Sequence, residues 1–293
     1  MRTLSTTSWD LSALVDRIPT TALALAVGHL DLAPLYDVTL MLMSEADSTR
    51  AELLETLLRG LLLGRDPRSE ILPRLGPGLV GFIDAPGPDD PITQPPMVLA
   101  LPVEESTVTE ALDNAFRTVL AIYALESKGG KGLGLPRLES TDLPGGGRLT
   151  ALVLDENARG PAFAYAIGEG LLVLGTSAET VAGYLASNEE EVGESAFRRT
   201  RERSFPEAES FAFIDLKTVH QLASDHREAL ARTLADRRGE DDETSARVDL
   251  DRVLAFAGLF RAAFATSTIA NDFTSAHRTL GLIVRDRAEL PNP

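Results

Sequence analysis

Cysteine is absent from all 293 residues of the chain. The chain therefore contains no disulfide, no thiolate metal ligand and no cysteine nucleophile. Histidine is nearly as scarce, with four residues, and the 23 glycines and 17 prolines fall below the levels of fibrous or disordered proteins. With 44% hydrophobic and 25% charged residues, the composition is that of an ordinary globular protein.

Positive charge is also in short supply. The chain has 28 basic and 44 acidic residues, a formal net charge of −16. This field repels the phosphate backbone of nucleic acids and anionic membrane surfaces alike. We therefore expect no nucleic-acid partner.

Long apolar runs of the membrane-spanning kind are missing too. The most apolar early stretch, residues 20–43, contains His29, Asp31 and Asp37, which are costly in hydrocarbon. Residues 253–270 hold an arginine near their middle, which favours a buried helix of a soluble protein. We expect no transmembrane segment.

The first nineteen residues show no basic segment followed by an apolar one, so no secretory signal is evident. This predicts a cytoplasmic protein. A location in the cell envelope is the alternative if the chain is a fragment of a longer exported protein.

The sequence does contain alternating strand and helix patterns. Strands are expected over residues 21–28, 78–84, 96–103, 147–154, 161–167, 171–175, 210–215, 267–273 and 278–285, and helices over residues 49–63, 107–126, 176–187, 216–237 and 249–265. A short helical turn is expected over 32–36, while 38–43 fits either a helix or a strand. The pattern predicts an α+β fold with mostly antiparallel sheet or sheets flanked by helices.

Three helix starts carry capping-box spacing, in which a threonine and a glutamate three residues later satisfy each other's backbone N–H groups. The pairs are Thr49 with Glu52, Thr107 with Glu110, and Thr176 with Glu179.

Two segments look like copies of one unit. Residues 18–32 and 205–219 each have an apolar residue and proline, a polar spacer, an apolar strand, an aspartate and a helix. The elements that follow also correspond, which suggests about one and a half copies of a strand–helix–hairpin unit. We accordingly expect a first unit over 1–188 and a second, partial unit over 189–293. The alternative is that strand–helix alternation looks repetitive in any α+β protein.

Two segments carry a resemblance to a known family: PAFAYAIGEGLLVLGTSAETVAGYL (161–185) and SFAFIDLKTV (210–219). Together they resemble an uncharacterised bacterial family of domains of unknown function. The resemblance implies alternating α and β elements, usually preceded by an N-terminal signal or membrane anchor. It implies no catalytic residues.

Motifs that suggest chemistry have simpler structural interpretations. The glycines of 130–134 follow a helix and precede Pro136, whereas a phosphate-binding loop follows a strand and opens a helix. Residues 175–179 have the strand–turn–helix setting of a nucleophile elbow but carry Glu179 where that motif has glycine, which favours a helix cap.

Metal sites are not indicated either. His220 and His226 are six residues apart on one predicted helix, so about 240° separates their side chains. The acidic runs at 189–191 and 240–243 lack the alternating ligands of a calcium loop. We predict no catalytic, cofactor-binding or metal-binding residues and no cofactor. Carboxylates brought together from distant positions, Asp84 among them, stay open as a hydrolytic pair.

These observations favour a non-catalytic protein-interaction or structural module that binds another protein or a second copy of itself. One alternative is a small-molecule or lipid-binding protein with an apolar groove. A third hypothesis is a hydrolase with dispersed catalytic residues.

Overall fold

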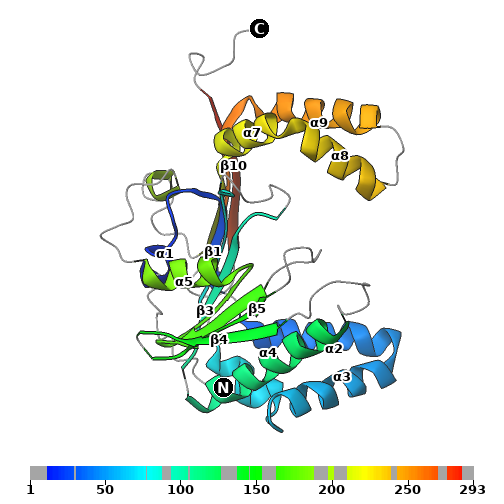
Figure 1. The fold of residues 1–293 in the computed structure, drawn as a ribbon, viewed down its shortest axis with the longest axis vertical. Helices are drawn as coiled ribbons and strands as arrows, with labels where there is room; N and C mark the ends of the chain where they lie inside the picture. The colour runs from blue at the N-terminus through cyan, green and yellow to red at the C-terminus, as the bar shows by residue number, and fades with distance from the viewer. Residues whose placement is uncertain are drawn as a thin grey trace. The chain divides into compact units, whose positions relative to one another are not determined.

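The structure is a computed structural model. It describes residues 12–29, 31–76, 78–87, 94–104, 106–126, 137–144, 146–153, 163–187, 197–200, 210–238, 243–269 and 276–285 (Figure 1). The strands are β1 (Ala22–His29), β2 (Gly78–Asp84), β3 (Met97–Pro102), β4 (Arg137–Asp142), β5 (Arg148–Val153), β6 (Phe163–Gly168), β7 (Leu171–Gly175), β8 (Ser210–Ile214), β9 (Phe260–Ile269) and β10 (Ala276–Val284). The helices are α1 (Ser12–Val15), α2 (Leu32–Ala46), α3 (Ser48–Leu61), the short turns η1 (Pro67–Ile71) and η2 (Leu72–Arg74), α4 (Ser106–Glu126), α5 (Ala178–Ala186), α7 (Leu216–Asp225), α8 (Arg227–Arg238) and α9 (Glu243–Ala257).

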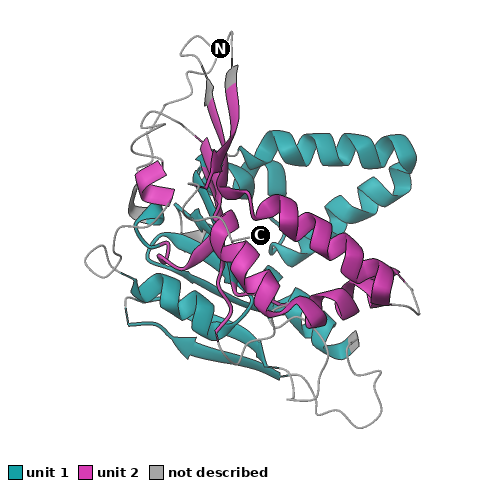
Figure 2. Ribbon diagram, turned by 90° about the horizontal axis from the view of Figure 1, so that it is seen from above, with its two compact units in different colours: residues 1–17, 28–81, 97–187 teal, residues 18–27, 82–96, 188–293 magenta. Residues whose placement is uncertain are grey.

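The α+β prediction is confirmed. Within the described residues, ten strands form an antiparallel sheet in the order β10-β9-β8-β1-β2-β3-β7-β6-β5-β4. Two compact units divide the chain: residues 1–17, 28–81 and 97–187 form the first, and residues 18–27, 82–96 and 188–293 form the second (Figure 2). The units are thus discontinuous in sequence, and the expected division at residue 188 stays a prediction.

Unit 1 is organised around strands β3 to β7, with α4 and α5 on opposite faces (Figure 1). α4 is the longest of the described helices, and its apolar side chains pack on β5 and β6. On the other face, α5 approaches β7 closely at Gly175, where a Cβ atom would lie 2.7 Å from Val181 Cγ2. Glycine at this position allows the close packing of helix on strand.

A buried polar group links α4 to the sheet. Tyr165 on β6 is fully buried and donates a 2.7 Å hydrogen bond to the Asp113 carboxylate on α4. Its ring lies 5.1 Å from the ring of Phe116. Ser140 and Thr150 join their hydroxyls at 3.1 Å between β4 and β5. These contacts position the helix by direction-dependent bonds as well as by apolar burial.

The β6–β7 hairpin turns where the sequence predicts it. Glu169 and Gly170 adopt positive φ values of 53° and 76° at the turn. This backbone conformation is easy for glycine and uncommon for glutamate. β7 then continues outward to pair antiparallel with β3, from Leu171 opposite Pro102 to Gly175 opposite Val98.

Unit 2 contains the strand series β10-β9-β8-β1 and the helices α7, α8 and α9. β1 and β8 pair antiparallel, with Leu25 opposite Phe213. α7 packs on β9 and on α9. Asp215 ends β8 and caps α7, because its carboxylate accepts from Thr218 N at 3.1 Å. The strand–aspartate–helix pattern of the sequence therefore has a direct structural cause.

The element order fits the expected repeat. β1, α2–α3 and β2–β3 form one series, and β8, α7–α9 and β9–β10 form another. Duplication itself stays a prediction, since the order of elements does not test common origin.

The helix expected over 249–265 is wrong in its second half. α9 ends at Ala257, and β9 begins at Phe260. Arg261, expected inside a buried helix, is exposed on this strand. A turn at Gly258 separates the two elements, where a Cβ atom would lie 2.9 Å from His220 Nε2. A continuous apolar run does not distinguish a helix from a strand by its periodicity, and here pairing with β8 and β10 makes it a strand.

Two of the predicted capping boxes are also wrong. Asp47, not Thr49, caps α3 by accepting from Thr49 N at 3.1 Å and Arg50 N at 3.2 Å. Ser177, not Thr176, caps α5 by accepting from Thr180 N at 3.1 Å. Asp47 precedes the expected cap Thr49, and Ser177 follows the expected cap Thr176. The residue just before the first helical residue becomes the cap in each case. The side chain of Thr107, the third expected cap, lies outside the described residues.

Three further elements differ from expectation. Residues 32–46 form one continuous helix, which settles the open assignment of 38–43. The helix expected over 216–237 is divided at His226, whose backbone N–H caps α7. β4 was not expected, because its sequence, RLESTD, is polar and lacks alternation.

Candidate interaction surface

Helix α2 is apolar on two opposite faces. Leu32 packs against the core of unit 1, and Tyr36 and Met43 are partly buried on the same side. At about 100° per residue, a second set of large apolar residues falls within about 120° of the helix circumference on the other side. This set, called here the outer stripe, consists of Leu35, Val38, Met41 and Leu42, which are 47% to 58% exposed.

A helix that is apolar all round is ordinarily buried. α2 is the exception, since none of its residues is classed as buried. Its two faces therefore differ: one packs on the core of unit 1, and the outer stripe is 47% to 58% exposed.

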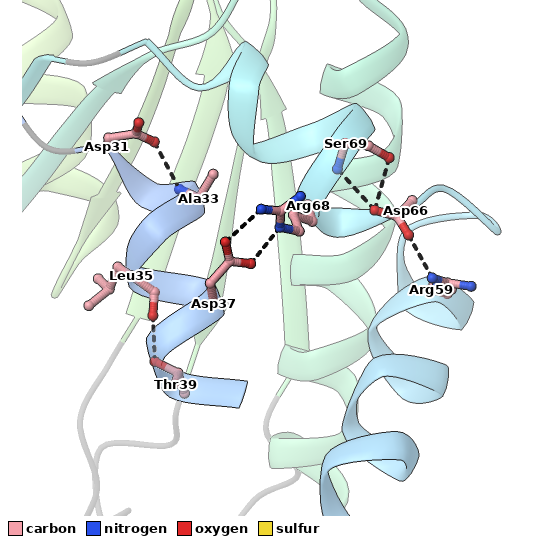
Figure 3. A network of polar contacts seen from close by, with 9 residues as sticks. All are labelled: Asp31, Ala33, Leu35, Asp37, Thr39, Arg59, Asp66, Arg68 and Ser69. Carbon is pink, nitrogen blue, oxygen red and sulfur yellow. Dashed lines mark hydrogen bonds and ion pairs between the residues drawn. The ribbon is translucent and has the colours of Figure 1, made fainter. Parts of the chain in front are cut away.

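An ion pair holds α2 in place (Figure 3). The Arg68 guanidinium on η1 donates to both carboxylate oxygens of Asp37, at 2.5 Å and 2.7 Å. This hydrogen bonding lowers the pKa of Asp37. Figure 3 shows Leu35 pointing away from the ion pair. The bidentate geometry joins α2 to η1 and fixes the orientation of the two side chains.

The start of η1 is itself held by Asp66. Its carboxylate accepts from Ser69 N at 2.9 Å and from Arg59 Nη2 at 2.6 Å (Figure 3). The Glu70 carboxylate in turn accepts a hydrogen bond from Asp66 N at 2.7 Å. The hydrogen bond from Ser69 N lowers the pKa of Asp66. Through Arg59, the same carboxylate connects η1 to the last turn of α3.

The α2–α3 hairpin is compact because one residue serves both helices. Asp47 N donates to Met43 O at 2.7 Å at the end of α2, and its carboxylate caps α3. At the other end of α3, Asn114 Nδ2 on α4 donates to Leu61 O at 2.7 Å. The hairpin is therefore anchored at both ends of α3, while its outer residues stay accessible.

α3 adds two exposed leucines to the hairpin. Leu53 and Leu57 lie one turn apart and are 68% and 57% exposed. Separately, the Tyr36 hydroxyl of α2 is buried and makes no hydrogen bond to protein. Burial, followed by the nearby Glu55 carboxylate, raises the pKa of Tyr36, so this hydroxyl stays protonated.

A cavity of about 500 Å³ with a mixed polar and apolar lining lies elsewhere in unit 1. Its described lining includes Glu110 and Asp113 of α4 and Asp142 and Arg148 of the β4–β5 hairpin. Arg148 lies 3.4 Å from Asp142, and Asp113 accepts from Tyr165. Asp113, Asp142 and Arg148 therefore have partners within the fold.

The residues considered from sequence are not brought together. Ser177 is the cap of α5, and its hydroxyl lies 2.8 Å from Thr180 Oγ1. His220 lies on α7 beside Gly258, and burial lowers its pKa, with Arg285 adding to the effect. His226 is at the end of α7. Asp84 is at the end of β2, where its carboxylate accepts from Ala85 N at 2.8 Å. The glycine loop 130–134 and the acidic residues 89, 90 and 189–191 lie outside the described residues.

Metal binding finds no support in the part of the chain that the structure describes. No group of three or more histidine, aspartate or glutamate side chains there is arranged to hold an ion. The outer stripe, by contrast, was not identified from sequence. Treating 32–46 as one helix would have shown its two apolar faces, but 38–43 was left undecided between helix and strand.

Comparisons with known proteins give no match to a family model, to a curated protein or to a solved structure. Among the described helices, none has both the length and the apolar character needed to cross a lipid bilayer.

Proposed function

We propose that the protein is a non-catalytic interaction module whose α2–α3 hairpin binds a partner protein. The outer stripe of α2 carries this proposal, because contiguous exposed apolar residues on a fixed helix are typical of docking surfaces. The Asp37–Arg68 ion pair supports it further, since a surface held in advance loses little conformational entropy on binding.

The geometry favours a partner with an apolar helix or groove. A helix displaying residues at i, i+3 and i+7 fits an apolar groove, as Leu35, Val38 and Leu42 are spaced. The net charge of −16 favours a partner surface with a basic rim, which would steer the encounter. A cytoplasmic location is part of this proposal and is tested by fractionation of native cells.

The absence of cysteine makes a site-specific test straightforward. A Val38→Cys variant labelled with a photo-reactive maleimide is irradiated in native cells, and adducts are identified by mass spectrometry. Arg237→Cys on exposed α8 is the matched control. We expect one partner to be captured from position 38 and not from position 237. Identical adducts from both positions, or none from position 38, would contradict the proposal.

Affinity for the identified partner is then measured with charge substitutions. Leu35→Lys combined with Leu42→Lys should weaken binding at least about tenfold, because burying an unpaired charge costs more than about 1.4 kcal/mol. Ser44→Lys adds one positive charge on α2 outside the outer stripe and should change affinity little. Binding of the unmodified protein to neutral lipid vesicles, lost in the double variant, would instead favour the lipid-binding alternative.

A further inference from the structure

β10 is the outermost strand at one end of the sheet, and in the described residues only β9 pairs with it. An edge strand presents unpaired N–H and C=O groups that readily pair with another strand. The two strands pair from Ala276 opposite Ile269 to Val284 opposite Phe260. The register is regular from Ala276 to Ile283 and shifts between Ile283 and Val284.

One face of this edge is apolar and uncovered. Leu280, Leu282 and Val284 are 85%, 51% and 65% exposed. They lie on the same face because side chains alternate along a strand. Opposite Leu280 and Leu282 on β9 lie the small residues Ala265 and Ala263, and Phe260 lies opposite Val284, yet all three side chains of β10 stay at least half exposed.

The opposite face of β10 is packed within unit 2. Gly281 lies opposite Phe264, whose ring occupies the space that a side chain would need. A Cβ atom built on Gly281 would lie 2.1 Å from Phe264 Cζ. A side chain larger than that of glycine at this position would collide with the Phe264 ring.

The first series of elements shows what covers such an edge. β3 follows β2 as β10 follows β9, and β3 is covered by the antiparallel strand β7, whose sequence is LLVLG. β10 carries the similarly apolar sequence LGLIV over 280–284. By this analogy, the missing neighbour of β10 is an antiparallel apolar strand.

We propose that β10 of a second copy fills this place, so that two chains pair through their β10 strands in an isologous dimer. A two-fold axis at Leu282 places this residue opposite itself and Leu280 opposite Val284 of the second copy. Every exposed apolar side chain of the strand then has an apolar partner. Two-fold dimers are the commonest closed assemblies.

The pairing concerns a different surface from the α2–α3 hairpin, and it does not rest on the function proposed above.

Disulfide formation tests the register directly. In the cysteine-free chain, Leu282→Cys should oxidise to a covalent dimer, since paired residues of antiparallel strands lie within disulfide distance. Leu280→Cys alone should not, but a mixture of Leu280→Cys and Val284→Cys chains should. Leu125→Cys, 60% exposed on α4, controls for random collision. Equal oxidation of the Leu282 and Leu125 variants would overturn the proposal.

Sedimentation of the unmodified full chain gives the second measurement. We expect a concentration-dependent dimer whose dissociation constant rises at least about tenfold in Leu280→Lys with Leu282→Lys, because like charges then face each other. Leu53→Lys, at a similarly exposed site on α3, should leave dimerisation unchanged. Leu280→Ser provides a milder variant if the double variant fails to fold. A monomer at all concentrations, or a dimer unaffected at β10, would overturn the proposal.

Discussion

The two edge strands of the sheet pair with their neighbours in the same antiparallel way, but their exposed side chains differ in polarity. β4 forms one edge and β10 the other. The side chains of β4 are mostly polar and exposed, and its charges are paired: Arg137 with Glu139 at 2.7 Å, and Asp142 with Arg148 at 3.4 Å. β10 instead exposes Leu280 and its apolar neighbours.

Charged, ion-paired edge strands are protected against pairing with other chains. β4 therefore has the polar composition of a protected edge strand, whereas β10 has the apolar composition of a strand that pairs on both sides. The same reasoning separates the polar surface of β4 from the apolar outer stripe of α2 within unit 1. Exposed large apolar residues also lie on other elements, such as Leu125 of α4 and Phe256 of α9, whereas β4 carries none.

The largest expected effect contrasts a buried residue of β6 with an exposed residue of β10. Tyr165→Ala removes a fully buried aromatic side chain and its bond to Asp113, and should lower the free energy of unfolding by about 3–5 kcal/mol. Leu280→Ala should lower it by less than about 0.5 kcal/mol in dilute protein, because this leucine is already in water. Urea denaturation of both variants measures the difference, and equal losses would remove the contrast.

The next prediction concerns how firmly β10 is seated. Gly281→Ala places a methyl group against the Phe264 ring and should lower the free energy of unfolding by about 1–3 kcal/mol. Gly81→Ala on β2 is the matched control, since its nearest contact would be 3.4 Å, to Leu99 Cδ1. Thermal unfolding compares the two variants. A stable Gly281→Ala protein would mean that β10 is loosely held.

Alkaline pH tests the role of the buried Tyr165 hydroxyl on β6. Burial, followed by the hydrogen bond with Asp113, raises the pKa of Tyr165 above its ordinary value of about 10. The folded state therefore retains a proton that the unfolded state loses, so this stability is present below about pH 10 and lost as pH rises above it.

Tyr165→Phe should remove that part of the alkaline decline and cost about 1 kcal/mol at neutral pH, from the lost hydrogen bond. Urea midpoints from pH 7 to pH 11 provide the measurement. Tyr184 is a second hydroxyl whose pKa burial raises, and it remains in both proteins. If the two proteins decline in parallel, Tyr165 does not contribute.

The smallest effect compares matched surface ion pairs in the two units. Hydrogen bonding to Arg68 lowers the pKa of Asp37, and hydrogen bonding to Arg238 lowers that of Asp249. Each contribution is present above the unfolded pKa of about 3.9 and is lost as pH falls through the lower folded value.

Asp37→Asn and Asp249→Asn should each remove a small part of the acid-dependent loss of stability. Hydrogen exchange should additionally show faster exchange in α2 for Asp37→Asn and in α8–α9 for Asp249→Asn. Faster exchange in both units from either substitution would contradict the local role given to these ion pairs.

Much of the secondary structure could be predicted from residue patterns. β1 and β8 are short apolar strands after a proline-containing segment, and their sequences predict them within one residue at each end. α4 shows clear helical periodicity. These elements depend on local preference and on apolar spacing, both of which are present in the chain itself.

The errors occur where a local pattern allows two structures. Residues 260–265 are apolar without a clear period, and they become a strand because β8 and β10 flank them on either side. Residues 38–43 were undecided for the same reason. The interaction surfaces were missed as a consequence, since an apolar residue in the sequence does not reveal whether another element covers it.

The sequence by itself determined the α+β class, the acidic surface and the absence of thiol chemistry, because these depend on composition and on spacing along the chain. Only the tertiary structure decided that Leu35 and Leu280 face solvent while Tyr165 does not. Exposure depends on which distant segments pack together, and that is set by the balance of burial over the whole fold.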